Sequence, residues 1–219
     1  MAEIIPEPRI VASLAAAPDV VAVGDADMIE VRLDLAKGDP IDVLKALRMA
    51  TKKPIIATNR LKAEGGQWRG SEEERISILI EAAKLADWVD IELRATLRDD
   101  VLKQVKKPAI VSYHDFIGMP SHEQLEAILE EMVSTGAAIS KIAVTPSTMK
   151  DDLIILEFLL EAKTPLCMIA MGPLGRHLRA VAPLYGSLLT YGYVSRPTAP
   201  GQMSISELKV ALKLLGREI

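Results

Sequence analysis

A lysine stands inside the apolar run Ile139-Ser140-Lys141-Ile142-Ala143-Val144-Thr145. Such short runs of β-branched and apolar residues are typical of strands buried on both faces of a parallel sheet. An ammonium group has no obvious structural use there, because a buried charge needs a partner or a function. A similar run at residues 109–116 carries His114 near its end. A lysine and a histidine on neighbouring strands could together form an imine and abstract a proton.

Runs of this kind recur along the chain, mostly at spacings of about 20 to 30 residues. We expect strands at residues 9–14, 28–35, 54–60, 88–93, 108–116, 139–145, 165–171 and 191–196. Helical patterns fill the segments between them.

Capping boxes predict where three of the helices begin, because a serine followed by Glu or Gln three residues later satisfies free backbone amides. They start at Ser71, Ser121 and Ser204, and the helices reach about residues 86, 133 and 215. A fourth helix is expected at residues 149–162. The weakest helical segment is 18–23, which Pro18 and Gly24 interrupt.

Strands alternating with helices predict a single-domain (β/α)8 TIM barrel, an α/β fold, that spans residues 1–219. A doubly wound open sheet is the alternative, but no Gly-x-Gly-x-x-Gly follows the first strand. Active sites of barrels lie at the carboxyl ends of the strands. Seven polar residues fall at or just beyond these expected ends, which predicts a site there: Ser13, Glu30, Arg32, Arg60, His114, Lys141 and Arg179.

Composition excludes several classes of protein. The chain has 219 residues, is 49% hydrophobic and carries a net charge of −4, so it can bury a large core and shows no surface for nucleic acid or membrane. The single cysteine, Cys167, lies in an apolar run and is expected to be buried and structural. No signal peptide, membrane helix or metal-binding motif is evident, so we expect a cytoplasmic protein without a metal or cofactor.

Glu30, Arg32 and Asp34 alternate along one expected strand and would therefore share a face. On a barrel strand this face points to the interior, where three charges must pair with one another or bind a ligand. Both interpretations remain open. Arg60 ends the next strand and leads to Glu64 in a glycine-containing loop. Glu64 could orient a histidine or contact a ligand.

Lys141 could act as a nucleophile only as a free amine, and the reference pKa of lysine is about 10.4. We expect burial and the cations Arg32, Arg60 and Arg179 to lower that pKa. A lysine held in a salt bridge is the competing interpretation. His114 suits acid–base catalysis near neutral pH, although a lone histidine at a strand end is often structural.

Two loops supply further candidates for ligand binding. Residues 171–179 form a glycine-containing turn after the seventh strand, where Arg179 could hold a carboxylate. A phosphate cradle is possible there, because barrels often bind phosphate near strands seven and eight. Residues 196–202 follow the eighth strand and offer Thr198 and Gln202 from a loop that could close over the site.

Together these segments resemble the type I 3-dehydroquinate dehydratases, and the match runs from Ser13 to Gln202. The order and spacing of several modest motifs carry it. They are Glu30-Val31-Arg32-Leu33-Asp34, Arg60–Gly66, Ser112-Tyr113-His114-Asp115-Phe116, Lys141-Ile142-Ala143-Val144 and Ala199-Pro200-Gly201-Gln202. The chain departs at Leu178 and Thr198, where the family often has serine; threonine keeps the hydroxyl.

The resemblance implies dehydration of 3-dehydroquinate to 3-dehydroshikimate in the shikimate pathway, without metal or cofactor, by an enzyme that is often a homodimer. It implies that Lys141 forms the Schiff base, that His114 is the general acid–base and that Glu64 assists His114. It further implies contacts with the small-molecule substrate from these residues: Ser13, Glu30, Arg32, Arg60, Arg179, Thr198 and Gln202.

Two other functions remain open. A different Schiff-base barrel, such as a class I aldolase, would use the same lysine for carbon–carbon cleavage. A catalytically silent barrel would bind a small acid without turnover.

Overall fold

The computed structural model describes residues 7–14 and 23–217. The weak segment expected at 18–23 therefore lies, but for its last residue, outside the described residues. These two ranges contain nine strands. They are β1 (Arg9–Leu14), β2 (Met28–Arg32), β3 (Ile55–Thr58), β4 (Trp88–Glu92), β5 (Ala109–His114), β6 (Ile139–Val144), β7 (Leu166–Ala170), β8 (Leu189–Tyr193) and the short β9 (Met203–Ser204).

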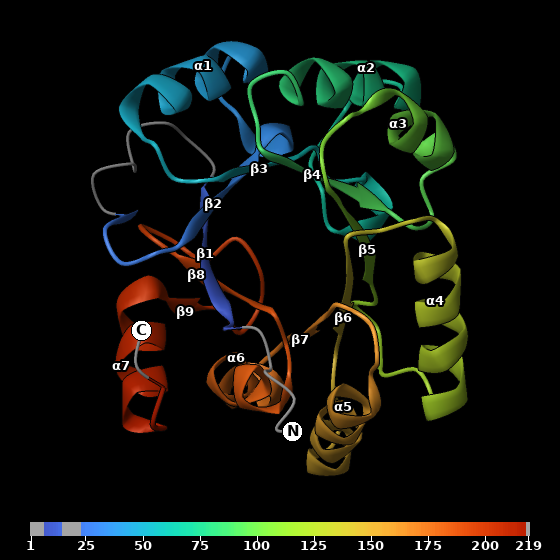
Figure 1. The fold of residues 1–219 in the computed structure, drawn as a ribbon, viewed down its shortest axis with the longest axis vertical. Coiled ribbons are helices and arrows are strands. Elements are labelled where there is room, and N and C mark those ends of the chain that lie inside the picture. The colour runs from blue at the N-terminus through green and yellow to red at the C-terminus, as the bar shows by residue number, and fades with distance from the viewer. Residues whose placement is uncertain (1–6, 15–22, 218–219) are drawn as a thin grey trace.

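The strands form one parallel sheet in the order β7-β6-β5-β4-β3-β2-β1-β8-β9. Strands β7 and β8 meet at the remaining junction, where the Leu188 amide donates to the Leu166 carbonyl oxygen at 2.9 Å. Strands β1 to β8 thus surround a common interior, and the helices lie outside them (Figure 1). The predicted (β/α)8 barrel is confirmed.

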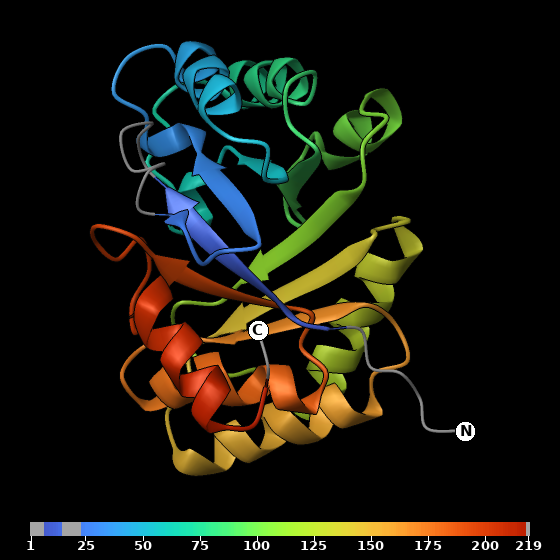
Figure 2. The ribbon, with the colours of Figure 1, turned by 60° about the vertical axis from the view of Figure 1, so that its left-hand side comes forward.

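The α-helices cover the outer face of the strands (Figure 2), and the 3-10 helices lie in the connections between the elements. The helices are α1 (Pro40–Ala50), α2 (Glu72–Ala82), α3 (Arg98–Gln104), α4 (His122–Ser134), α5 (Met149–Glu161), α6 (Leu178–Val181) and α7 (Ile205–Leu214). The 3-10 helices are η2 (Leu33–Leu35), η3 (Lys62–Glu64), η4 (Leu174–His177) and η5 (Ala182–Tyr185).

The three predicted capping boxes, at Ser71, Ser121 and Ser204, are all formed, and each begins the expected helix. Helix α1 begins with Asp39 as its N-cap and Pro40 at its first position, a start signal that the sequence also contains.

Several expected boundaries were wrong. The strand predicted at 28–35 ends at Arg32, and that at 54–60 ends at Thr58, because the chain turns toward 3-10 helices there. The strand predicted at 191–196 lies two residues earlier, at Leu189–Tyr193. The helix predicted to reach residue 86 ends at Ala82.

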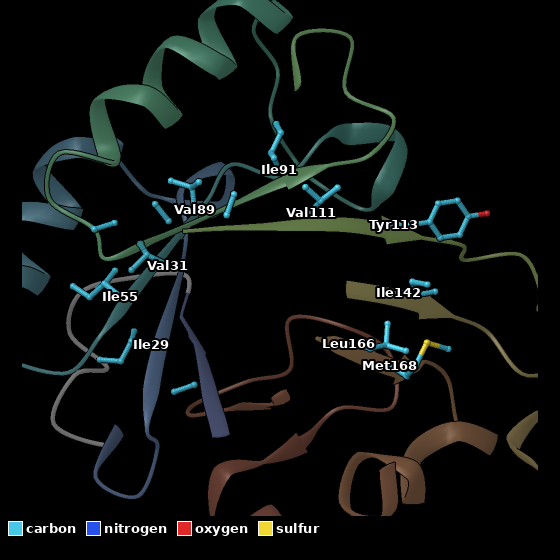
Figure 3. Packing of buried hydrophobic residues seen from close by; sticks show 14 of the residues in the cluster. Ile29, Val31, Ile55, Val89, Ile91, Val111, Tyr113, Ile142, Leu166 and Met168 are labelled. Carbon is cyan, nitrogen blue, oxygen red and sulfur yellow. The ribbon is translucent and has the colours of Figure 1, made fainter. Parts of the chain in front are cut away.

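Alternation along the strands divides the buried residues into two layers. Ile29, Val31 and Ile91 belong to the outer layer that packs against the helices (Figure 3). Met28 and Ile56 belong to the separate cluster in the barrel interior. Polar residues that alternate with the outer apolar ones must therefore point into the barrel, which positions the site described next.

Candidate active site

One cavity of about 170 Å³ opens among the inward side chains of the barrel. Every candidate that the sequence singled out lines it: Ser13, Glu30, Arg32, Arg60, Glu64, His114, Lys141, Arg179, Thr198 and Gln202. A larger hollow of about 1150 Å³ lies at the opposite, amino-terminal mouth, where the first residues of β1, β2, β4, β6 and β8 line it. None of the candidates faces that hollow, so the small cavity is the candidate site.

The amine of Lys141 lies between two carboxylates. Its Nζ is 3.1 Å from Oδ2 of Asp90 and 3.5 Å from Oε1 of Glu30, and it sits 4.0 Å from the centre of the Tyr191 ring. The side chain is buried, at 5% exposure. The charged groups in contact with Nζ are thus carboxylates, as in the competing interpretation of a lysine held in a salt bridge.

Lys141 is also deeper than expected. It is the third of six residues in β6, and Glu30 is the third of five in β2, so neither lies at a strand end. The prediction located the polar residues on the rim, but the barrel places these two one layer below it. Their depth explains why so little solvent reaches them.

A chain of alternating buried charges leads to Lys141. Arg75 contacts Glu92 at 2.8 Å, Glu92 contacts Arg60 at 2.9 Å, Arg60 contacts Asp90 at 3.0 Å, and Asp90 contacts Lys141. We refer to these five residues as the charge chain. Each charge has an opposite neighbour, which is the condition for keeping ions in a low-dielectric interior.

Asp90 is fully buried, and burial by itself would raise its pKa. Arg60 and Lys141 more than offset that effect and hold the pKa of Asp90 below its usual range. The Ser112 hydroxyl also donates to Oδ1 of Asp90 at 2.6 Å. Asp90 is therefore a carboxylate.

His114 ends β5 and is held by Glu64. Oε2 of Glu64 accepts the His114 backbone amide and lies 2.9 Å from its Nδ1. Burial, with help from Arg60 and Lys141, holds the pKa of His114 well below its usual value, so the imidazole is neutral. When the Glu64 carboxylate accepts Nδ1–H, Nε2 carries the lone pair and can act as a base.

Burial raises the pKa of Glu64 to about 7, although Arg60 opposes this effect. Its Oε1 is buried without a hydrogen-bond partner. Glu64 can therefore gain or lose a proton near neutral pH beside His114.

Hydroxyl groups surround Glu30. Ser13 donates to its Oε2 at 2.6 Å, and Thr58 donates to its Oε1 at 3.2 Å. Thr198 donates to Ser13 at 3.0 Å, and the Thr198 amide donates to Oε1 of Gln202 at 2.8 Å. The loop after β8 is thus tied to the floor of the cavity.

Arg32 and Asp34 form a bidentate pair, with Nε–Oδ1 and Nη2–Oδ2 distances of 2.8 and 2.7 Å. The interpretation as a self-paired ion cluster is therefore right for these two residues. Glu30 is different, because it faces Lys141.

Arg179 is buried, at 3% exposure, and its Nε has no hydrogen-bond partner. Its Nη2 donates only to a carbonyl, that of Pro200, at 3.3 Å. In the described part of the chain no carboxylate pairs with it, and burial lowers its pKa to about 10. A buried guanidinium without a counterion is suited to an anionic ligand. The predicted turn at 171–179 includes η4 and the first turn of α6, which positions this arginine.

Six buried residues of the site were not predicted: Thr58, Arg75, Asp90, Glu92, Ser112 and Tyr191. The alternation Trp88-Val89-Asp90-Ile91-Glu92 in β4 could have revealed two of them, because it repeats the pattern of Glu30 and Arg32. Cys167 is buried as expected, and burial raises its pKa to about 11.

Within residues 7–14 and 23–217, no helix is long and apolar enough to cross a bilayer. No group of three or more His, Cys, Asp or Glu side chains in the same ranges could hold a metal ion.

Comparison with known proteins agrees with this arrangement. Residues 5–219 match the model of a family described as type I 3-dehydroquinase. The chain belongs to the type I 3-dehydroquinase family. It is 56% identical over 216 residues to the 3-dehydroquinate dehydratase of Methanothrix thermoacetophila, covering 97% of this chain and 94% of that protein. It is 44% identical over 215 residues to that of Methanocella arvoryzae, with 95% and 97% covered.

Solved structures of type I 3-dehydroquinases have the same fold. The crystal structure of 3-dehydroquinate dehydratase from Geobacillus kaustophilus superposes with a TM-score of 0.89 at 29% identity, covering 96% of this chain and 91% of that one. The type I enzyme from Clostridium difficile, solved with covalently modified comenic acid, gives a TM-score of 0.86 at 29% identity, covering 98% and 94%.

Proposed function

We propose that this protein is a 3-dehydroquinate dehydratase that converts 3-dehydroquinate to 3-dehydroshikimate and water in the shikimate pathway, through an imine at Lys141. One observation carries the proposal: Lys141, the neutral His114 and the unpaired Arg179 line the same small, buried cavity. Family membership names the reaction, and these three groups supply a nucleophile, a base and an anion site.

The first half of the reaction forms the imine. The ammonium of Lys141 releases one proton, and the free amine attacks the C3 ketone of the substrate to give a carbinolamine. A proton then returns to the carbinolamine hydroxyl, which leaves as water and gives a protonated imine. The positive nitrogen withdraws electrons and acidifies the C2 proton. Nε2 of His114 removes this proton, which leaves a neutral enamine and a protonated imidazole.

The second half expels water and releases the product. His114 returns its proton to the C1 hydroxyl, which departs as water, and the enamine becomes a conjugated iminium. A second water molecule hydrolyses the iminium and frees Lys141. Glu64 accepts Nδ1–H and thereby stabilises the imidazolium between the two proton transfers.

The remaining residues hold the substrate in place. The guanidinium of Arg179 binds the substrate carboxylate, with Gln202 beside it on the loop after β8. Ser13, Glu30 and Thr198 are hydrogen-bonded to one another. They contact the substrate oxygens by replacing these hydrogen bonds with hydrogen bonds to the substrate. Two arginines, Arg32 and Arg60, complete the polar wall.

Borohydride reduction in the presence of 3-dehydroquinate tests the two main roles separately. We expect peptide mapping to find a reduced adduct at Lys141, and we expect none in Lys141→Ala. His114→Ala should still give the adduct but turn over roughly 100-fold or more slowly. Lys150→Ala, which changes an exposed lysine of α5, is the control and should behave like the unmodified protein. Normal turnover in Lys141→Ala would contradict the mechanism.

The same experiment separates the two alternatives. Formation of an adduct without the enone absorbance of the product would favour an aldolase-like enzyme. Binding of 3-dehydroquinate without adduct or product would favour a non-catalytic barrel.

We also propose that the protein is a cytoplasmic homodimer. Helix α5 exposes an apolar stripe, with Met149, Leu153 and Leu160 each more than half exposed, and an apolar patch of this kind favours association. Light scattering should give twice the mass of one chain, and Leu153→Glu should give a single chain. A monomeric unmodified protein would contradict this assembly.

A further inference from the structure

The two carboxylate oxygens of Asp90 have different partners. Its Oδ1 pairs with Arg60 at 3.0 Å and accepts the Ser112 hydroxyl at 2.6 Å. Its Oδ2 lies 3.1 Å from Nζ of Lys141 and accepts no other hydrogen bond in the described part of the chain. Oδ1 therefore holds the carboxylate in place, and Oδ2 interacts with the amine.

Glu30, the other carboxylate near Lys141, is placed less well for this purpose. It is 3.5 Å from Nζ, and the same Oε1 also accepts the Thr58 hydroxyl. Its side chain retains 5% exposure, whereas that of Asp90 is wholly buried. Coulomb interactions strengthen at shorter range and lower dielectric, so Asp90 is the stronger counterion.

We propose that Asp90 is the counterion of the reacting nitrogen in its cationic states and keeps the imine protonated. This inference rests on the function proposed above and adds a residue to it. Formation of the imine converts R–NH3⁺ and a ketone into a protonated imine and water, so the nitrogen keeps one positive charge while two of its protons leave with the ketone oxygen. A carboxylate in contact with Nζ therefore faces a cation both before and after the C–N bond forms.

The protonation state of the imine decides whether the chemistry works. Only the protonated imine withdraws electrons strongly enough to acidify C2. A neighbouring carboxylate favours the charged form of a nitrogen base. Burial of Asp90 makes this effect larger than it would be in water.

The charge chain explains how Asp90 remains ionised in this position. Arg60 contacts the opposite oxygen, Glu92 pairs with Arg60, and Arg75 pairs in turn with Glu92. The carboxylate thus stays fixed whether the amine is free or bonded to substrate. Such a preorganised charge needs no rearrangement during the reaction.

Asp90→Asn tests the proposal, because asparagine keeps the shape and removes the charge. We expect the rate of borohydride trapping with 3-dehydroquinate to fall roughly 10- to 100-fold, the effect of losing one charge-assisted hydrogen bond. The Asp90 charge also favours the protonated form of His114, so its loss lowers the pKa of His114 further. The fall of kcat/KM at low pH, which is the acid limb of its pH profile, should therefore move to lower pH by about one unit or more.

Glu72→Gln is the matched control. Glu72 is a carboxylate that pairs with Arg75 at the far end of the charge chain, 2.7 Å from its Nε, and it does not contact Lys141. This variant should trap at the rate of the unmodified protein with an unmoved acid limb. Equal losses in both variants would mean that the charge chain matters only for structure and would overturn the proposal.

Ser112→Ala provides a second test should Asp90→Asn not fold. It removes a hydroxyl that donates to Asp90 but keeps the carboxylate, so the acid limb should stay in place or move to higher pH. A move to lower pH would overturn the proposal, as would wild-type trapping and pH dependence in Asp90→Asn. Absence of any adduct in the unmodified protein would instead refute the proposed function, so the two failures are distinguishable.

Discussion

Replacing Glu64 by glutamine should remove a contribution to the stability of the protein that falls as the pH rises. The Glu64 side chain is 2% exposed, and burial raises its pKa from 4.5 to about 7. The folded protein therefore binds a proton that the unfolded chain has already released between these two pH values. It follows that the folded state loses stability as the pH rises from 4.5 to 7.

The size of the effect follows from the two pKa values. Their separation corresponds to about 3 kcal/mol of unfolding free energy, at about 1.4 kcal/mol per pKa unit. Glutamine carries no charge at any pH and does not contribute this loss. We expect Glu64→Gln to gain about 2 to 3 kcal/mol relative to the unmodified protein between pH 4.5 and pH 8.

His114 has the opposite dependence, because its pKa is lower in the folded protein. The stability that comes from its neutral form is lost as the pH falls below 6.5. Both proteins contain His114, so the difference between them removes this contribution except for the part that Glu64 adds through its contact with Nδ1.

Urea denaturation at several pH values between 4.5 and 8 measures the difference directly. Glu130→Gln, on the exposed surface of α4, serves as control and should follow the unmodified protein. A difference that is constant over this range, or one in which Glu64→Gln loses stability relative to the unmodified protein as the pH rises, would refute the reasoning about Glu64.

Two further changes test the buried framework of the site. Arg75→Met would remove the partner of Oε2 of Glu92, while Oε1 keeps its pair with Arg60. We therefore expect the unfolding free energy to fall by about 2 to 3 kcal/mol in urea denaturation; a loss below about 1 kcal/mol would show that the pair contributes little. Gly201 has φ +69°, and a Cβ there would clash with the Gly172 carbonyl oxygen. Gly201→Ala should therefore displace the loop after β8. We expect KM for 3-dehydroquinate to rise roughly tenfold, which corresponds to about 1.4 kcal/mol. Gly38→Ala has a similar strained φ of +100° but an open surrounding, and it should leave KM unchanged; equal KM values in both variants would contradict the role of the loop.

Local chemistry in the sequence was enough to predict the elements of the fold. The capping boxes at Ser71, Ser121 and Ser204 form as expected, because each depends only on residues within one turn of helix. The buried strands were recognised from their apolar runs. The ends of the strands were predicted less accurately. Residues 33–35 continue the apolar pattern but form a 3-10 helix, and hydropathy does not indicate that change in chain direction.

The candidate residues were also found from the sequence, since a polar side chain within a buried strand needs a reason to be there. Lys141, His114 and Arg179 all line the one small cavity. The partners of these residues could not be predicted in the same way. Asp90 lies 51 positions from Lys141 along the chain. The two residues meet because only β5 lies between their strands and both side chains point into the closed barrel.

The amino-acid sequence by itself therefore determined the alternation of strands and helices, the helix starts and the candidate catalytic and binding residues. These depend on periodicity and on short-range hydrogen bonds. Only the tertiary structure decided the electrostatics of the site. It placed carboxylates beside Lys141, left Arg179 without a counterion among the described residues and raised the pKa of Glu64. These properties depend on distances and burial among residues far apart in the chain, which exist only once the barrel has closed.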